Sequence, residues 1–171
     1  MTAHAAVLQT FVGAFGVAVD DDGRLLRAHF LEDRDAAAFE RLLVDEGHEV
    51  VRSPEACAQA TEELGDYFAG RRRTFSLRIA PLEGTPFQQR VWAELLRIPF
   101  GETISYGELA RRVEVTGGSR AVGRANHENP VPIVIPCHRV IGQDGTLTGF
   151  GGGLDAKRKL LDFERGQGSL F

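Results

Sequence analysis

Cys137 and His138 are the adjacent side chains in this sequence best suited to covalent chemistry. A thiolate is a strong nucleophile, and a neighbouring imidazole is a common base for making one near neutral pH. The pair lies in the segment Ile135-Pro136-Cys137-His138-Arg139-Val140. Sequence neighbours need not face each other, and free cysteine is often a core residue, so the dipeptide alone leaves catalysis and packing both open.

The segments around this pair favour a binding site. Asn129-Pro130-Val131-Pro132 precedes it, and Thr148-Gly149-Phe150-Gly151-Gly152-Gly153 follows it. Such a density of glycine suits a backbone that passes close to a ligand. We therefore expect a reaction centre between these two segments.

Length and composition indicate an ordinary globular protein. The 171 residues are 43% apolar, with two cysteines and five scattered histidines. This composition predicts neither a disulfide framework nor a structural metal, and no cofactor is expected. Without an apolar run of about 20 residues or a leader-like N-terminus, we expect a cytoplasmic protein.

Charge is distributed unevenly along the chain. Residues 1–85 contain 9 Lys/Arg and 15 Asp/Glu, whereas residues 86–171 contain 11 and 9. A polyanionic partner is therefore expected to bind the second half, although a solvated helix face also explains this modest asymmetry.

The first half has the pattern of a small α/β domain. Apolar segments at residues 11–19 and 25–30 flank a turn, which predicts a β-hairpin. Helices are predicted from Asp35 to residue 44 and from Ser53 to Gly70, with strands near Val50 and over residues 75–79. Cys57 falls on the apolar face of the second helix, which predicts a core residue.

The second half is predicted to be mainly helical. Thr85-Pro86-Phe87-Gln88 has the pattern of a capping box and opens a helix to Ile98. Ser105-Tyr106-Gly107-Glu108 opens another, to about Val113. A third, from about Ser119 to His127, completes a helix-turn-helix, whose second helix commonly docks on DNA.

The faces of this third helix differ in character. Ala121, Val122 and Ala125 suit packing, whereas Arg120, Gly123, Arg124 and His127 share another, basic side with little bulk. Small residues allow a close approach to a duplex, and arginines contact phosphate or act as a wedge. A helical hairpin with a solvated basic face explains the pattern equally well.

The last predicted helix covers residues 154–164. It carries Lys157, Leu160, Leu161 and Glu164 along one stripe. A carboxylate on an apolar stripe needs a partner, for which an imidazole is the clearest candidate, unless the helix end frays and Glu164 is solvated.

Several blocks of the second half resemble the O6-alkylguanine-DNA alkyltransferases, which are single-use DNA repair proteins. They include GTPFQQRVW, IPFGETISYGELA, SRAVG, NPVPIVIPCHRVIG and the ending GGL-x-x-K-x-x-LL-x-x-E, between Gly84 and Glu164. The resemblance implies a ribonuclease H-like α/β domain over residues 1–82 and a mainly helical DNA-binding and alkyl-acceptor domain over residues 83–171. It implies a monomer that acts on duplex DNA carrying O6-alkylguanine, with O4-alkylthymine as a further candidate substrate.

The resemblance also implies roles for individual residues. Cys137 is the alkyl acceptor, His138 and Glu164 form its hydrogen-bond network with the help of a water, and Asn129 braces the turn before it. Tyr106 lies near the flipped nucleotide, and Arg120 fills the gap left in the duplex. The candidate DNA-binding residues are Arg120, Ala121, Gly123 and Arg124. The candidate substrate-pocket residues are Phe150, Gly151, Gly152 and Val140.

The sequence departs from the family pattern at three positions. The helix-turn-helix turn usually has glycine and proline where this chain has Glu114 and Thr116. Phe150 stands where tyrosine is usual, which removes a hydroxyl. The cysteines with which some relatives bind zinc in the first domain are absent.

Two other classes of function share some of these residues. A Cys-His-Glu hydrolase would form a hydrolysable thioester and turn over repeatedly, whereas alkyl transfer to sulfur gives a stable thioether. A non-catalytic sensor of damaged bases would bind without transfer, and relatives of that kind lack the acceptor cysteine. Cys137 therefore favours the alkyltransferase.

Overall fold

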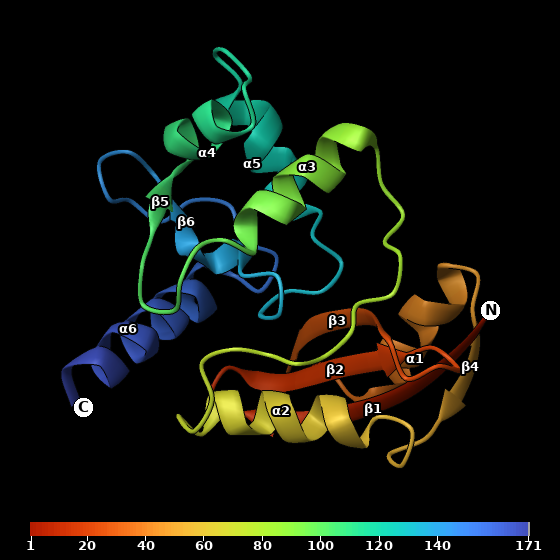
Figure 1. Ribbon diagram of the computed structural model, residues 1–171. Coiled ribbons are helices and arrows are strands. Elements are labelled where there is room, and N and C mark those ends of the chain that lie inside the picture. The colour runs from red at the N-terminus through yellow and green to blue at the C-terminus, as the bar shows by residue number, and fades with distance from the viewer. Residues whose placement is uncertain (171) are drawn as a thin grey trace. The chain divides into compact units, whose positions relative to one another are not determined.

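The computed structural model describes residues 1–170, with side chains up to residue 166. The chain divides into two compact units, Met1–Leu82 and Glu83–Phe171 (Figure 1). Among the described residues, no helix is long and apolar enough to cross a membrane.

The first unit contains a four-stranded sheet with the order β3-β2-β1-β4. Its strands are β1 (Thr2–Thr10), β2 (Gly13–Val19), β3 (Leu25–Glu32) and β4 (Glu49–Arg52). The predicted hairpin is confirmed as β2 and β3, which pair antiparallel. β1 was not predicted, because its buried residues Ala3 and Ala5 are small and have little β-propensity.

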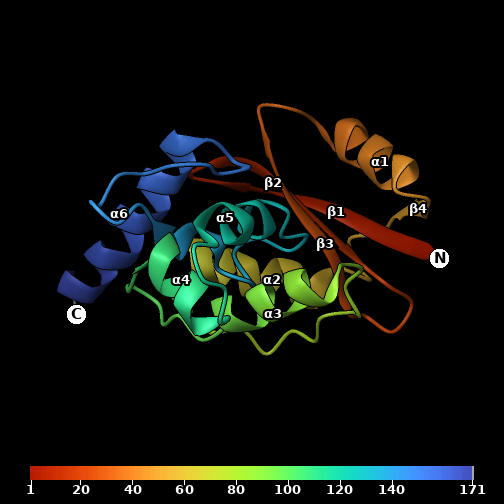
Figure 2. The same cartoon turned by 90° about the horizontal axis from the view of Figure 1, so that it is seen from above.

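Two helices, α1 (Ala36–Asp45) and α2 (Ala58–Phe68), cover opposite faces of this sheet (Figure 2). On one face, a Cβ at Gly16 would lie 2.7 Å from the ring of Phe39, so only glycine leaves room for α1. On the other face, the rings of Phe15 and Phe68 make an edge contact at 5.6 Å. The alternation of side chains along β2 thus buries both of its faces.

Two predicted elements of this unit were placed incorrectly. α2 begins at Ala58 rather than at Ser53, because the Ser53 hydroxyl accepts from the amide of Ala56 (3.2 Å) and caps a separate turn. The predicted strand over residues 75–79 makes only an isolated bridge between Ile79 and Leu25. The amide of Ser76 instead donates to the carboxylate of Glu63 (2.8 Å).

The second unit is mainly helical, as predicted. Its helices are α3 (Pro86–Leu95), α4 (Tyr106–Arg112), α5 (Ser119–His127), the 3₁₀ turn η1 (Cys137–Arg139) and α6 (Leu154–Leu170). Two short strands, β5 (Ile104–Ser105) and β6 (Val140–Ile141), pair in parallel. This pairing places the residues that directly follow η1 beside those that directly precede α4.

Local capping explains where these helices begin. Both hydrogen bonds of the predicted capping box at Thr85 and Gln88 are formed. Ser105 caps α4, but the side chain of Glu108 pairs with Arg111 and Arg112 instead of returning to the cap.

α3 ends at Leu95 rather than Ile98. Its buried Trp92 donates from Nε1 to the carbonyl of Ala125 on α5 (2.9 Å), which joins α3 to α5.

Candidate active site

Cys137 is the first residue of η1 and lies at the end of a tightly braced loop. The carboxamide of Asn129 holds this loop twice, donating to the carbonyl of Ile135 (2.7 Å) and accepting from the amide of Val131 (3.0 Å). The amide of Cys137 donates to the carbonyl of Ile135 (2.8 Å). The loop that leads to Cys137 is therefore held by a side chain that lies just after the end of α5.

A second asparagine links Cys137 directly to α5. Asn126, buried within that helix, donates from Nδ2 to the carbonyl of Cys137 (3.2 Å). The sequence does not predict this role of Asn126, because an asparagine in a helix has many uses. Cys137 and the second helix of the helix-turn-helix are thus joined through one hydrogen bond.

His138 and Glu164 meet in the interior of this unit. His138 is 0% exposed and Glu164 is 1% exposed, and Nε2 of the histidine lies 2.7 Å from Oε2 of the carboxylate. The structure thus brings together these two predicted residues from segments 26 positions apart. Glu164 is buried rather than solvated at a frayed helix end.

Arg139 is a third member of this cluster. Its Nε donates to Oε1 of Glu164 (2.9 Å), and its Nη2 donates to Oε2 (3.0 Å). Its Nη1 donates to the carbonyl of Ile98 (2.7 Å), and the amide of Gly101 donates to Oε1 of Glu164 (3.2 Å). Glu164 therefore anchors η1 and the segment after α3 to α6.

These contacts determine the protonation states. Burial alone would raise the pKa of Glu164, but the hydrogen bonds and charges of His138 and Arg139 hold that pKa below its usual range. Burial lowers the pKa of His138 despite the carboxylate, while Arg139 and Lys157 lower it further. A neutral His138 donates Nε2–H to the ionised Glu164, which leaves the lone pair on Nδ1.

Nδ1 of His138 is buried and has no hydrogen-bond partner among the described residues. A neutral imidazole with a free Nδ1 is a proton acceptor. Burial raises the pKa of the Cys137 thiol to about 11, against the opposing influence of Asn129 and Lys157. The thiol is therefore protonated at pH 7, so a reaction of the Cys137 sulfur as a nucleophile needs a base.

Tyr106 and Lys157 converge on one carbonyl of the glycine-rich loop. The Tyr106 hydroxyl donates to the carbonyl of Thr148 (3.0 Å), and so does Nζ of Lys157 (3.0 Å). Lys157 Nζ also lies 3.4 Å from the Tyr106 oxygen. Burial raises the pKa of Tyr106 and lowers the pKa of Lys157 to about 8.

The predicted pocket residues belong to two segments, β6 and the glycine-rich loop. Val140 is fully buried in β6, directly after η1. Phe150, Gly151 and Gly152 follow Thr148 in the glycine-rich loop, where Gly152 is buried and Gly151 is exposed. The structure thus brings the loop to Tyr106 through Thr148.

The outer face of α5 is largely the basic face that the sequence predicts. Arg120, Arg124 and His127 are exposed, and Gly123 lies beside the Tyr106 ring, where a Cβ would fit at 3.8 Å. Val122 and Ala125 are buried as predicted. Ala121 is exposed, so its predicted packing role is wrong, and it shares solvent access with Arg120.

The turn between α4 and α5 accommodates its unusual residues. Glu114 has a φ of 61°, the left-handed conformation that favours glycine. The amide of Glu114 donates to the carbonyl of Arg111, and that of Val115 donates to the carbonyl of Ala110, which completes a Schellman motif. The helix end therefore has the geometry of a glycine turn without the glycine.

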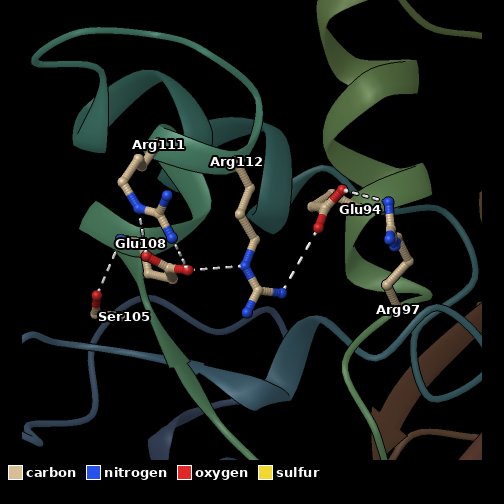
Figure 3. Close-up of polar contacts among 6 residues, drawn as sticks. All are labelled: Glu94, Arg97, Ser105, Glu108, Arg111 and Arg112. Carbon is tan, nitrogen blue, oxygen red and sulfur yellow. Dashed lines mark hydrogen bonds and ion pairs between the residues drawn. The ribbon is translucent and has the colours of Figure 1, made fainter.

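A chain of charged side chains fastens α4 to α3 (Figure 3). Arg112 bridges the two helices, because its Nε lies 3.0 Å from Glu108 on α4 and its Nη1 lies 3.6 Å from Glu94 on α3. Arg97 and Arg111 pair with the same two carboxylates. This network steadies the helix whose first residue is Tyr106.

Comparison with known proteins identifies the family. Residues 4–81 match the ribonuclease-like domain of 6-O-methylguanine DNA methyltransferase, and residues 86–166 match its DNA binding domain. A methylated-DNA–protein-cysteine methyltransferase of Mycolicibacterium paratuberculosis is 49% identical over 140 residues, which cover 79% of this chain and 84% of the relative. The chain belongs to the 6-O-methylguanine DNA methyltransferase family.

Other relatives of this methyltransferase extend the match to nearly the whole chain. A methylated-DNA–protein-cysteine methyltransferase of Methanosarcina acetivorans is 40% identical over 161 residues, covering 94% of this chain and 97% of the relative. The structure of Mycobacterium tuberculosis OGT in complex with DNA is 39% identical and has a TM-score of 0.82, covering 96% of this chain and 94% of that one. The predicted family and the predicted fold class are thereby confirmed.

Three residues of the methyltransferase site were not assigned from the sequence. Two of them carried a usable signal in the sequence. Arg139 is a cation directly after His138, the predicted partner of a buried carboxylate, and Lys157 is a cation on the same apolar stripe as Glu164. Asn126 carried no such signal. Its role depends on the carbonyl of Cys137, which only the folded loop brings within reach.

Proposed function

We propose that this chain repairs duplex DNA by transferring the alkyl group of O6-alkylguanine to Sγ of Cys137, once per molecule. The observation that carries the proposal is the base that directly follows the cysteine in the chain: a buried His138 whose Nε2 is bound to Glu164 and whose Nδ1 has no hydrogen-bond partner within the part of the chain that the structure describes. The second unit thus combines a nucleophile, its base and a helix-turn-helix, as expected of the alkyl-acceptor domain over residues 83–171.

The chemistry begins with loss of the thiol proton. Nδ1 of His138 accepts it, and the ionised Glu164 stabilises the imidazolium that forms. The sulfur then attacks the alkyl carbon, and the bond from that carbon to guanine O6 breaks. The product is a thioether that water does not cleave, so the protein is consumed.

The base has to leave the duplex before it can react. Rotation of a nucleotide out of the stack costs a few kcal/mol, and a wedge such as Arg120 offsets part of that cost. Arg124 contacts phosphate, while the small residues Ala121 and Gly123 allow α5 to approach the groove. Asn129 holds the acceptor loop.

The flipped base occupies the region between the acceptor turn and the glycine-rich loop. Phe150, Gly151, Gly152 and Val140 line it, and the Tyr106 hydroxyl donates to the base as negative charge develops there. We assign the ribonuclease-like residues 1–82 a supporting role and place the protein in the cytoplasm as a monomer.

The decisive experiment counts transferred groups and locates them. Excess duplex containing O6-methylguanine should add one methyl to the Cys137 peptide, leave Cys57 unmodified, and stop at one lesion per protein, as measured by peptide mass spectrometry. Cys137→Ser should abolish transfer and retain DNA binding, because an unactivated hydroxyl is too poor a nucleophile. Repeated turnover would indicate a hydrolase, and binding without transfer by the intact protein would indicate a damage sensor.

A further inference from the structure

Two buried side-chain atoms of the second unit have no hydrogen-bond partner among the described residues, Nδ1 of His138 and Oδ1 of Asn126. The first is the base of the alkyl transfer proposed above, whereas the second has no part in that chemistry. Asn126 is 1% exposed, and a buried acceptor left without a donor costs free energy. A donor that arrives with the substrate would satisfy this oxygen.

Neighbouring residues fix how the Asn126 carboxamide is oriented. Its Nδ2 donates to the carbonyl of Cys137 (3.2 Å), and because a carbonyl only accepts, the nitrogen has to lie on that side. Burial raises the pKa of the Tyr106 hydroxyl, and a hydrogen bond with the same carboxamide opposes that rise. Asn126 thus contacts both Cys137 and Tyr106, and its oxygen is left to accept a hydrogen bond.

A stripe along α5 leads from the protein surface to this carboxamide. Arg120, Gly123 and Asn126 are spaced by three residues, so they lie next to one another on adjoining turns. Three residues fall about 60° short of a full turn, so the stripe winds from the exposed side to the buried side. Arg120 is exposed, Gly123 lies beside the Tyr106 ring, and Asn126 is buried. A nucleotide displaced at Arg120 would therefore meet Asn126 on its way to Cys137.

Alkylation determines which donors a base can offer to this oxygen. Guanine carries N1–H and an exocyclic amino group, but an alkyl group on O6 removes the N1 proton, so only the amino group can still donate. O4-alkylthymine has lost its N3 proton in the same way and offers acceptors alone. A buried oxygen that needs a donor therefore fits the guanine lesion and does not fit the thymine lesion.

We propose that Oδ1 of Asn126 accepts a hydrogen bond from the exocyclic amino group of O6-alkylguanine and so selects guanine over bases that lack this group. The inference rests on the alkyl transfer proposed above and adds a specificity-determining residue to it. No bond forms or breaks at Asn126. Its Nδ2 holds the carbonyl of Cys137, so one side chain contacts both the bound base and the residue that accepts the alkyl group.

The size of the preference follows from the state of this oxygen in each complex. A base without the amino group would leave Oδ1 buried and unpaired while it occupies the site. A site that is built to hydrogen-bond its substrate rejects an analogue that lacks the bonding group for this reason. We expect a rate difference of about 10- to 100-fold from one unsatisfied neutral acceptor.

The test compares O6-benzylguanine with O6-benzylhypoxanthine, the same base without its amino group, in single-turnover transfer to the full chain. Free bases need no unstacking, so the ratio of the two rates reports on the pocket alone. The unaltered protein should react about 10- to 100-fold faster with O6-benzylguanine. Asn126→Leu has the same shape without polar atoms and should lower this ratio about 10-fold. His127→Gln, on the exposed side of α5, is the matched control and should keep the ratio.

A second variant separates the oxygen of the carboxamide from its nitrogen. Asn126→Asp keeps an acceptor oxygen and loses the Nδ2 donor to Cys137, so both rates should fall while their ratio is retained. Thermal unfolding checks that each variant is folded. A full ratio in Asn126→Leu would overturn the proposal even if both rates fell, because Asn126 would then only support the Cys137 carbonyl. Loss of the ratio in Asn126→Asp would overturn it too, as would equal rates for the two bases in the unaltered protein.

Duplex DNA extends the test to the thymine lesion. The unaltered protein should repair O6-methylguanine faster than O4-methylthymine, and Asn126→Leu should narrow that gap. An unchanged gap would contradict selection against thymine by Asn126. Absence of methyl transfer from O6-methylguanine to Cys137 in the unaltered protein would instead defeat the underlying function, so the two failures are distinguishable.

Discussion

The two cysteines are alike by the usual measures of thiol reactivity and differ in their neighbours. Both are buried, and burial raises the pKa of each to about 11. Sγ of Cys57 faces the backbone carbonyls of His4 (3.2 Å) and Val17 (4.0 Å). Cys137 is instead followed in the chain by His138, and the charge of Lys157 opposes the effect of burial on its pKa. The pKa of the resting thiol therefore does not distinguish the two cysteines, and we propose that the proton acceptor His138 decides which sulfur reacts.

The interiors of the two units also differ in the polar side chains that they bury. Among the described residues, the buried polar side chains of the first unit are Asp20 and Glu63. Those of the second are Asn126, Asn129, His138, Arg139, Lys157 and Glu164. Burying polar side chains costs desolvation free energy, which lowers the stability of the second unit. The hydrogen bonds among these side chains in turn hold the site in one arrangement.

Glu164→Gln should have the largest effect because it removes the charge that organises this interior. Arg139 would be left buried without its carboxylate, which should lower the free energy of unfolding by about 3 kcal/mol in urea denaturation. His138 would become a weaker base, so the pH at which the transfer rate half-saturates should rise. An unchanged pH–rate profile would mean that Glu164 serves only the fold.

The pH dependence of stability tests the same carboxylate. The pKa of Glu164 is lowered on folding, so its contribution is complete above its unfolded value of about 4.3 and is lost as the pH falls below it. The unaltered protein should therefore lose more stability than Glu164→Gln between pH 5 and pH 3. Parallel stability curves would contradict this assignment.

Arg120→Ala should have the next largest effect, and only on duplex DNA. Without a wedge, the cost of unstacking is uncompensated, and repair should slow about 10- to 100-fold. Reaction with free O6-benzylguanine should be unchanged, because the surroundings of Cys137 are intact. Arg124→Ala is the matched variant and should mainly weaken binding and reduce its salt dependence. If Arg120→Ala slowed the reaction equally with duplex DNA and with free O6-benzylguanine, the proposed wedge role of Arg120 would be wrong.

Cys57→Ala tests the contrast between the two cysteines at the thiol that we expect not to react. Loss of the buried sulfur should cost about 1 kcal/mol of stability, as is usual for a small core truncation. The number of methyl groups transferred per protein should stay at one, since the sulfur of Cys57 faces the backbone carbonyls of His4 and Val17. A decline in transfer in the still-folded variant would show that the first unit contributes to the chemistry.

Glu114→Gly should have the smallest effect and the opposite sign. Glycine adopts the left-handed conformation of this position without strain, so the free energy of unfolding should rise by about 0.5 to 1 kcal/mol. Thr116→Gly in the same turn is the control and should be destabilising, because Thr116 does not have a positive φ. A loss of stability in Glu114→Gly would indicate that the glutamate side chain is held by a contact.

Sequence predicts best what is determined locally. The capping pattern of Thr85 and Gln88 and the bounds of α5 follow from residues within one or two turns. It predicts less well what depends on distant partners. Residues 75–79 have an alternating pattern, yet Glu63 takes the amide that a strand would pair. β1 carries a weak pattern and is a strand because its neighbours β2 and β4 pair with it.

The site shows the same division. A carboxylate on an apolar stripe predicts that Glu164 has a buried partner, and chemistry predicts His138. That Arg139 shares the carboxylate depends on the 3₁₀ turn η1, which the adjacent positions of His138 and Arg139 in the sequence do not reveal. Likewise, Lys157 meets Tyr106 only because the carbonyl of Thr148 turns toward both.

Trp92 gives the molecule a built-in optical probe. It is the single tryptophan of the chain, and it lies buried in the second unit with its indole N–H bound to the carbonyl of Ala125 on α5. Its emission spectrum responds to solvent and to the electric field of nearby groups, so fluorescence reports on the unit that holds Cys137. Circular dichroism sums both units. A difference between the two signals during denaturation would show whether the units unfold together or one after the other.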